Sequence, residues 1–449
     1  MLFFKKHFLL SLALLTGAVL HAQKTKEAKE VFDLQRCVEQ AIERNFDVKI
    51  SRNRADAAAN NASPGNAGYL PTVDGNAGYS GTFNNFQNTY SRTGADAKYD
   101  NNHTGSYNLG VGLTWKIFDG FNMSATLSRY KDLQQIGELS TKLSVEQLVA
   151  EVTAMYYDVV QRKIRMKNLR QSLDLSRFRL RIAQEQFYYG SRSRIEVLQA
   201  EADFNADSST YATYAEGIKQ LKIRLKEKLQ VPFNQAIYVQ DTMLTVQRNL
   251  ELATLEQLAT LNNTSLKIYD KNRDVSAQER KQVEAGRYPY LNFNAGYGYS
   301  GNSYSTGSNT RYENLGFNYG LTLGIKIYDG SNQRRMERNA VLEQKNRELE
   351  YEHQQLQVQT DLQQLYSNYL HYINLLQLEQ HNKDLAEQKV DLAMEQYKHG
   401  QLTSIGLREF QRTLLDAQDR VVNALYQTKY AEIYLMQLCG MSQIYMEPS

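Results

Sequence analysis

The chain has 449 residues, with 52 Lys and Arg against 49 Asp and Glu, and a formal net charge of +3. Because the charges nearly cancel, no basic field points to nucleic acid as a partner. The two cysteines, Cys37 and Cys439, form no CxxC motif, the histidines show no HxH or HExxH spacing, and no Ser, His and acid motif stands out. The sequence therefore gives no support for an enzyme, a metal site or a cofactor.

Residues 1–22 are predicted to be a secretory signal peptide. Lys5 and Lys6 precede an apolar run over 8–20, which ends before a cleavage site after Ala22. A transmembrane anchor is disfavoured because the run is shorter than the ~20 residues that a helix needs to span a bilayer. The remaining sequence has no apolar stretch of about 18 residues, so membrane insertion would require strands closed into a barrel.

The sequence contains two copies of one plan. "KIFDG" ends at Gly120 and "KIYDG" ends at Gly330, 210 residues later. Two further pairs are "EQFYYG" with "EQYKHG", also 210 residues apart, and "AGYLP" with "AGRYP", 218 apart. Each copy is predicted to consist of a helix, a strand, a loop, a second strand, a long helix, a turn and a rising helix.

Each copy carries two predicted strands. Over 107–117 and again over 317–327, apolar side chains occupy the odd positions, and polar residues or glycines occupy the even ones. Weaker alternation over 73–83 and 291–299 predicts a partner strand upstream of each. A period of two gives each strand one apolar and one polar face.

The segments between the paired strands, 83–104 and 302–313, are rich in Asn, Ser, Thr and Gly and are predicted to be surface loops. A soluble two-sheet sandwich would show the same alternation. The signal peptide, strand lengths near ~9 to 11 residues and aromatic residues near strand ends favour a membrane barrel. Four strands cannot close a barrel whose smallest known size is about eight strands, so several chains must contribute.

Long helices are predicted from Gly120 to Gly190 and from Gly330 to Gly400, each roughly 105 Å in length. Their apolar residues recur in heptads, which predicts antiparallel coiled-coil hairpins joined at Gly190 and Gly400. In the first long helix the heptad positions are Val152, Met155, Val159, Met166, Leu169, Leu173, Leu180, Ala183 and Phe187. A fibrous coiled coil or adhesin stalk remains the alternative that the heptads alone allow.

The motifs at the start of each long helix are expected to form a collar between strand and helix. Asp119 and Asp329 can cap the first helical turn, and Gly120 and Gly330 can relax the bend. The predicted organisation is a signal peptide (1–22), an N-terminal segment with the first upper helix (23–66), the first strand pair (67–119), the first long helix, turn and rising helix (120–230), a linker (231–251), the second upper helix (252–285), the second strand pair (286–329), the second long helix, turn and rising helix (330–440), and a tail (441–449).

The signal peptide, the duplicated plan, the "FDG" and "YDG" ends, and the turns of form aromatic-x-x-G-x-x-S/T together resemble the TolC family of outer-membrane efflux proteins. The resemblance spans roughly residues 34–440. It implies a homotrimer, in which three chains form a 12-stranded barrel in the outer membrane and a 12-helix tunnel across the periplasm. It also implies passive export of drugs, small toxic molecules or secreted proteins, with a periplasmic adaptor and an inner-membrane transporter as partners.

The resemblance places the adaptor contact at the two hairpin tips. The corresponding residues are Phe187, Gly190, Ser193, Glu196, Val197 and Leu198 in the first tip, and Tyr397, Gly400, Thr403 and Ser404 in the second. Local structure alone could also require four of them, because glycine permits positive φ after a helix, and Ser193, Thr403 or Ser404 could cap the rising one.

The family's entrance latch, an Arg and a pair of Asp, is not kept as a whole. Leu402 stands at the Arg position, Gly406 at the first Asp position and Glu409 at the second. Glu409 is therefore the candidate for an acidic ring at the entrance, with Glu196 as its weaker counterpart. The competing interpretation is that an exposed helical Glu is simply solvated.

The cysteines are predicted to lie at similar heights along the rod, Cys37 about 38 Å and Cys439 about 47 Å below the barrel. The chain is expected to be exported to an oxidising compartment, which would permit a disulfide, but two buried free thiols are favoured over it. Two functions from different classes remain: a trans-periplasmic export duct and a barrel-anchored structural stalk.

Overall fold

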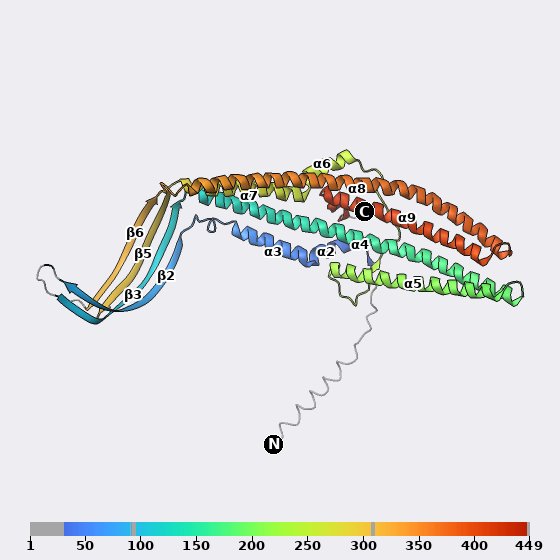
Figure 1. The fold of residues 1–449 in the computed structure, drawn as a ribbon, viewed down its shortest axis with the longest axis horizontal. Coiled ribbons are helices and arrows are strands. Elements are labelled where there is room, and N and C mark those ends of the chain that lie inside the picture. The colour runs from blue at the N-terminus through green and yellow to red at the C-terminus, as the bar shows by residue number, and fades with distance from the viewer. Residues whose placement is uncertain (1–30, 90, 92–95, 307–309, 447–449) are drawn as a thin grey trace, which may run out of the picture.

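The computed structural model describes residues 31–89, 91, 96–306 and 310–446. The chain is an elongated rod, with a curved sheet at one end and long helices running away from it (Figure 1). The signal peptide predicted at residues 1–22 lies outside the described residues. Among the described helices, none is both long enough and apolar enough to cross a membrane.

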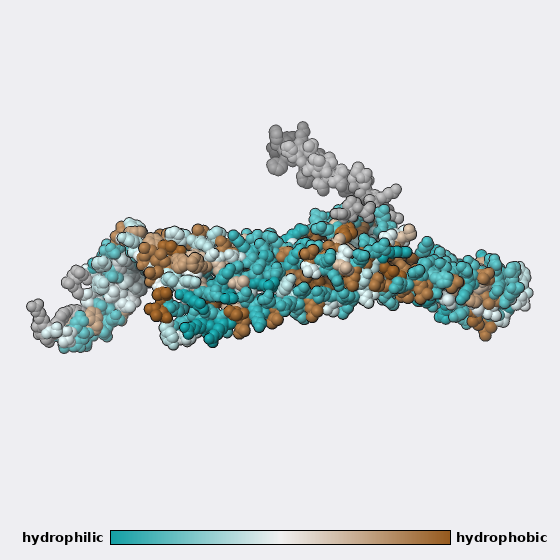
Figure 2. Space-filling model, turned by 90° about the horizontal axis from the view of Figure 1, so that it is seen from above, coloured by the Kyte–Doolittle hydropathy of each residue, from teal (hydrophilic) through white to brown (hydrophobic). Residues whose placement is uncertain are grey.

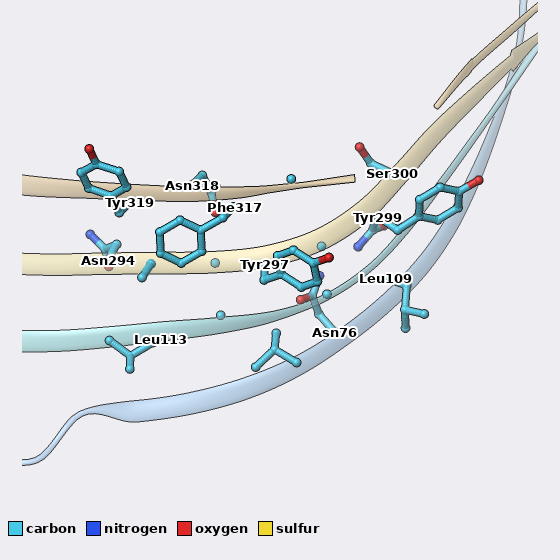
Figure 3. A pocket seen from close by; sticks show the side chains of 18 of the residues that line it. Asn76, Leu109, Leu113, Asn294, Tyr297, Tyr299, Ser300, Phe317, Asn318 and Tyr319 are labelled. Carbon is cyan, nitrogen blue, oxygen red and sulfur yellow. The ribbon is translucent and has the colours of Figure 1, made fainter. Parts of the chain in front are cut away.

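The predicted strands form one antiparallel sheet. Its order is β2 (Thr72–Thr89), β3 (Asp96–Phe118), β5 (Tyr290–Tyr304) and β6 (Arg311–Gly324). Alternation separates its two faces, with Val111, Tyr297 and Phe317 side by side on one face and Asn318 and Gly296 paired on the other. Figure 3 shows such aromatic, leucine and asparagine side chains along neighbouring strands.

The prediction of long loops between the paired strands was wrong. Most of 83–104 belongs to β2 and β3, and half of 302–313 belongs to β5 and β6. These segments are rich in residues that favour turns, but the backbone hydrogen bonds between strands do not require apolar side chains. Polar side chains add to the ladder instead, since the Gln87 amide donates a 2.9 Å hydrogen bond to Asp96.

The last predicted strand is shorter than its alternation suggested. β6 ends at Gly324, which pairs with Tyr290, the first residue of β5. Beyond that pair β5 offers no further backbone, so Ile325 and Ile327 lie outside the strand. The apolar alternation of 317–327 therefore overstated the strand.

The two long helices are confirmed. α4 (Asn122–Tyr188) and α8 (Asn332–Lys398) each contain 67 residues and are therefore roughly 100 Å long. α5 (Arg194–Leu229) and α9 (Ser404–Leu438) run back along them as the predicted antiparallel hairpins (Figure 1). Of the heptad residues in α4, Val152, Val159, Leu169, Leu173 and Ala183 are buried, whereas Phe187 at the tip is 44% exposed.

Each upper helix, predicted as continuous, is broken once. The first consists of α2 (Leu34–Arg44) and α3 (Phe46–Asn61), and the second of α6 (Leu252–Asn262) and α7 (Thr264–Glu284). Asn45 and Asn263 lie at the breaks, where each side-chain oxygen accepts a backbone N–H of the next helix. Asparagine is a strong N-cap, so it starts a new helix within an otherwise helical pattern.

The helices form a single curved layer (Figure 1). Near the sheet the order is α3, α4, α7 and α8, and toward the tips it is α5, α4, α9 and α8. Midway along the rod a short parallel pair, β1 (Val31–Phe32) and β4 (Tyr238–Val239), packs against the layer with α2, α6 and the 3-10 helix η2 (Ser442–Tyr445). This region, here called the equator, contains the largest buried core.

Both cysteines lie in the equatorial core as free, buried thiols. The Cys439 thiol donates to the backbone oxygen of Leu255 at 3.5 Å. Burial raises the pKa of the Cys37 thiol to about 12 and that of the Cys439 thiol to about 11. Both groups are therefore protonated and poorly nucleophilic at neutral pH.

Candidate functional site

The collar has the predicted caps. An Asp119 carboxylate oxygen accepts the Met123 N–H at 3.0 Å, and an Asp329 carboxylate oxygen accepts the Gln333 N–H at 2.9 Å. Gly120 and Gly330 have φ near +70°, as do the non-glycine residues that follow each of them. Two consecutive left-handed residues thus turn the chain from strand to helix.

The two collar glycines differ in their surroundings. A Cβ on Gly120 would lie 2.4 Å from the backbone oxygen of Ala285, the first residue of the 3-10 helix η1 (Ala285–Arg287) that precedes β5. Gly120 is therefore required by both backbone conformation and close packing. Around Gly330 no described atom lies within 4 Å of such a Cβ, so only its positive φ favours glycine.

The hairpin tips have the predicted turns. Gly190 and Gly400 both have φ of +73°. Thr403 caps α9 by accepting the Gly406 N–H at 3.1 Å, whereas Ser193 occupies the same position before α5 without a side-chain cap. Glycine at both tips is explained by the local turn geometry.

The two tips expose different amounts of apolar surface. In the first, Phe187 and Leu198 are exposed, and Tyr188 and Tyr189 beside them are more than three quarters exposed. In the second, Tyr397 and Ser404 are buried between the hairpins, while Gly400 and Thr403 are exposed. Only the first tip thus presents an aromatic surface that another protein could reach.

A network of charges joins the two hairpins just above the tips. Arg408 of α9 donates two hydrogen bonds to Asp207 of α5, at 2.6 and 2.7 Å. Ser176 of α4 also donates to Asp207, and Gln411 of α9 donates to Ser176 at 2.8 Å. We call these four residues the tip network.

A second set of contacts lies closer to the turns. Arg179, fully buried on α4, pairs with Asp203 at 2.7 Å and also donates to the backbone oxygen of Ser404. Burial lowers the pKa of Arg179, and the Asp203 carboxylate partly offsets this effect. Arg192 of the first tip donates to the backbone oxygen of Leu402 in the second at 3.1 Å. These contacts join residues that no sequence motif connects, and they hold the two hairpins together near the turns.

The two candidate acidic residues differ. Glu196 forms a 2.6 Å ion pair with Arg192, which neutralises its charge locally. Glu409 is exposed on α9 and makes no ion pair with any described residue. Of the two, only Glu409 therefore keeps a carboxylate whose charge no described ion pair compensates.

A curved sheet with an apolar face, continued by long helical hairpins that ion pairs join near their tips, is typical of channel-tunnel proteins. The model of the outer membrane efflux protein family matches residues 37–229 and 255–441, and the chain belongs to this family. It is an outer-membrane efflux channel, with its sheet in the cell outer membrane and its helical part in the periplasm. The resemblance noted from the sequence is confirmed.

Solved structures with the same fold include the Campylobacter jejuni CmeC outer membrane channel, with 16% identity and a TM-score of 0.74 over 91% of this chain and 86% of that one. The outer membrane protein VceC from Vibrio cholerae has 16% identity and a TM-score of 0.72 over 91% of this chain and 96% of that one. The open state of the Neisseria gonorrhoeae MtrE outer membrane channel has 15% identity and a TM-score of 0.71 over 92% of this chain and 91% of that one. No curated protein sequence matches the chain significantly.

Asp119→Ala is expected to destabilise the collar by about 1 kcal/mol per chain, because the first turn of α4 loses its cap. Thermal unfolding and the yield of assembled protein would measure this loss. Asp119→Asn, which keeps an acceptor oxygen, should lose less. Full assembly of Asp119→Ala with transport alone abolished would contradict a structural role.

Arg408→Ala is expected to loosen the tips, because Asp207 would lose its partner in a largely buried setting. Spin labels at the exposed positions Ile195 and Ile405 would report this as a longer and broader distance distribution between the hairpins. Arg412→Ala, an exposed change on the same helix, is the matched control. Identical distributions for both variants would rule out the tip network as the restraint.

Proposed function

We propose that three copies of the chain form a closed 12-stranded barrel continued by a 12-helix tunnel. The observation that carries this proposal is the pair of free sheet edges: within the described residues, β2 pairs only with β3, and β6 only with β5. A sheet in a bilayer cannot leave its edge N–H and C=O groups unpaired. Joining β6 of each copy to β2 of the next satisfies both edges, and three copies provide twelve strands.

The helical layer has the same two edges as the sheet. α3 and, nearer the tips, α5 form the edge of the layer that continues β2, and α8 forms the edge that continues β6 (Figure 1). Exposed leucines follow α8 at intervals of seven, eight or fourteen residues, namely Leu342, Leu349, Leu356, Leu370, Leu378, Leu385 and Leu392. Figure 2 looks onto this edge and shows apolar patches along the rod. Such a stripe needs a partner helix, and in the proposed ring the next chain supplies one.

The resulting tunnel acts as a passive exit duct for drugs, small toxic molecules or secreted proteins. An inner-membrane transporter supplies the energy, and a periplasmic adaptor contacts the tips. The proposed contact surface consists of the exposed Phe187 and Leu198 and the half-buried Val197 of the first tip, with Gly190 and Ser193 at its turn. In the second tip Gly400 and Thr403 are accessible, whereas Tyr397 and Ser404 support the contact from within. The chain itself carries out no catalysis.

Reconstituted protein is expected to be trimeric by light scattering and to conduct ions in planar bilayers. Conductance should appear only in fractions containing the trimer, because one chain cannot enclose a bore. A trimer without conductance would favour a structural stalk. A conducting monomer would overturn the proposed ring.

Glu409→Gln is expected to reduce the cation preference of single channels severalfold, because the ring would lose three carboxylates at a narrow entrance. Reversal potentials in a salt gradient and block by divalent cations would measure the effect. Glu201→Gln, an exposed change on α5, is the control. Unchanged ion preference and divalent block in Glu409→Gln would mean that Glu409 is only a solvated surface residue.

A further inference from the structure

The two repeats can be matched residue by residue. α4 and α8 have equal lengths, and their numbers differ by 210, as do those of the tip glycines. The upper helices match at a difference of 218, which superposes the breaks at Asn45 and Asn263. Any contact that one repeat makes can therefore be sought at the matching place in the other.

α4 and α8 differ in what covers them. α4 is covered on one side by its own repeat, through α3 and α5, and on the other by α7 and α9 of the second repeat. α8 is covered by α7 and α9, and its other side carries the exposed leucines. Gly120 and Gly330 show the same difference, since one is packed against Ala285 and the other is open.

At the equator, the first repeat has a groove between α2 and α4 that the chain fills with its own tail. After α9 the chain turns at Gly440, where φ is +67°, and η2 then packs against both helices. Tyr445 is buried there, and Met446 packs against the core. Between the tail and α4 only a cavity of about 320 Å³ remains, lined by Val145, Glu146 and Val149.

The matching groove of the second repeat, between α6 and α8, is open. It has a volume of about 930 Å³, and Gln355, Leu356 and Gln359 line it at the positions that match the cavity residues on α4. Leu261 and Leu356 in its wall are 69% and 62% exposed. The groove is also continuous with the leucine stripe of α8, to which Leu356 belongs.

The segment that matches the tail is the turn after α5. Gln230 matches Gly440 and is also left-handed, with φ of +51°. Both turns close with the same bond, Val231 N–H to Lys226 O at 3.0 Å and Met441 N–H to Met436 O at 2.8 Å. The following turn presents Phe233, which is 67% exposed, at the place that matches Gln443.

This turn cannot reach the open groove of its own chain. Figure 1 shows α6 on one edge of the helical layer and the end of α5 on the opposite edge, at a similar level along the rod. Phe233 thus projects from one edge of the layer and the groove lies on the other, so copies of the chain can join head to tail into a ring. The occupant is therefore a second copy of the chain.

We propose that residues 231–236 of one copy fill the α6–α8 groove of the next, with Phe233 as the apolar knob. This inference rests on the proposed trimer and specifies its equatorial contact. A second matched pair supports it. Within the chain, Glu146 accepts a hydrogen bond from Thr264 at 3.0 Å, whereas the matching Leu356 and Phe46 are both apolar and more than 60% exposed. The surfaces left bare are thus apolar on both edges.

Cysteine cross-linking tests the contact in the full-length protein. Phe233→Cys combined with Leu261→Cys, treated with a short bismaleimide, is expected to give covalent dimers and trimers on denaturing gels. Each single variant, and Phe233→Cys combined with Ile405→Cys at the distant tip, should give none. The native thiols are buried and should not react.

The outcomes separate this inference from the proposed function. Trimers that form and conduct but give no cross-link would overturn the contact and leave the export duct intact. Protection of Leu261→Cys from a monofunctional maleimide in such trimers would indicate another occupant, such as the chain's own N-terminal residues. Absence of any trimer would overturn both.

Phe233→Asp provides an independent test. It is expected to weaken trimer association roughly tenfold or more, because the apolar Phe side chain would no longer be buried in the groove. Met243→Asp is the matched control, because Met243 is also an exposed apolar residue (75%) of the same linker. It should leave trimer association unchanged. Equal effects of the two variants, measured by dilution in detergent, would overturn the role of Phe233.

Discussion

The free backbone edges of β2 and β6 are the constraint on which the rest of the structure depends. In a bilayer each unpaired N–H or C=O costs several kcal/mol, so a four-stranded sheet must find partners for both edges. The helical layer continues the sheet: α3 and α5 lie on the same edge as β2, and α8 lies on the same edge as β6. In the proposed trimer, the pairing of strands from neighbouring copies therefore also decides which helical faces meet.

Duplication explains why one chain can present two different edges on a regular layer. The repeats keep the same backbone features: helices of 67 residues, left-handed tip glycines and asparagine breaks. They diverge where a contact lies within the chain in one repeat and at an edge in the other. Glu146 with Thr264 is a polar buried pair, and the matching Leu356 and Phe46 are apolar and bare. This difference should discourage the internal and external contacts from exchanging.

Much of the fold follows from periodicity in the sequence. The change from period two to helical spacing located the strands, and Asp119 and Asp329 cap the helices as their position suggested. The strand ends and the helix breaks were missed, because pairing with a neighbouring strand and N-capping by a buried Asn override composition. The tip network could not be predicted from the sequence, because Arg408 and Asp207 are 201 positions apart and belong to no motif. Only the packing of α9 against α4 and α5 brings them together.

The distribution of buried groups suggests where the rod can open. At the equator, α9 is tied to the linker and the tail through Glu432, which is 1% exposed. Glu432 accepts hydrogen bonds from the Gln247 N–H, from the Tyr445 hydroxyl at 3.4 Å and from Lys429. Apolar side chains surround this pair, so separation there would expose both a charge and the core. At the tips, the carboxylates of Asp203 and Asp207 are 17% and 15% exposed and lie beside open solvent at the end of the rod. Parting the hairpins there would hydrate the partly exposed Arg408–Asp207 pair and expose only the small apolar cluster around Tyr397 and Leu407, which costs less than exposing the equatorial core. Opening should therefore begin at the tips and reach the equator last.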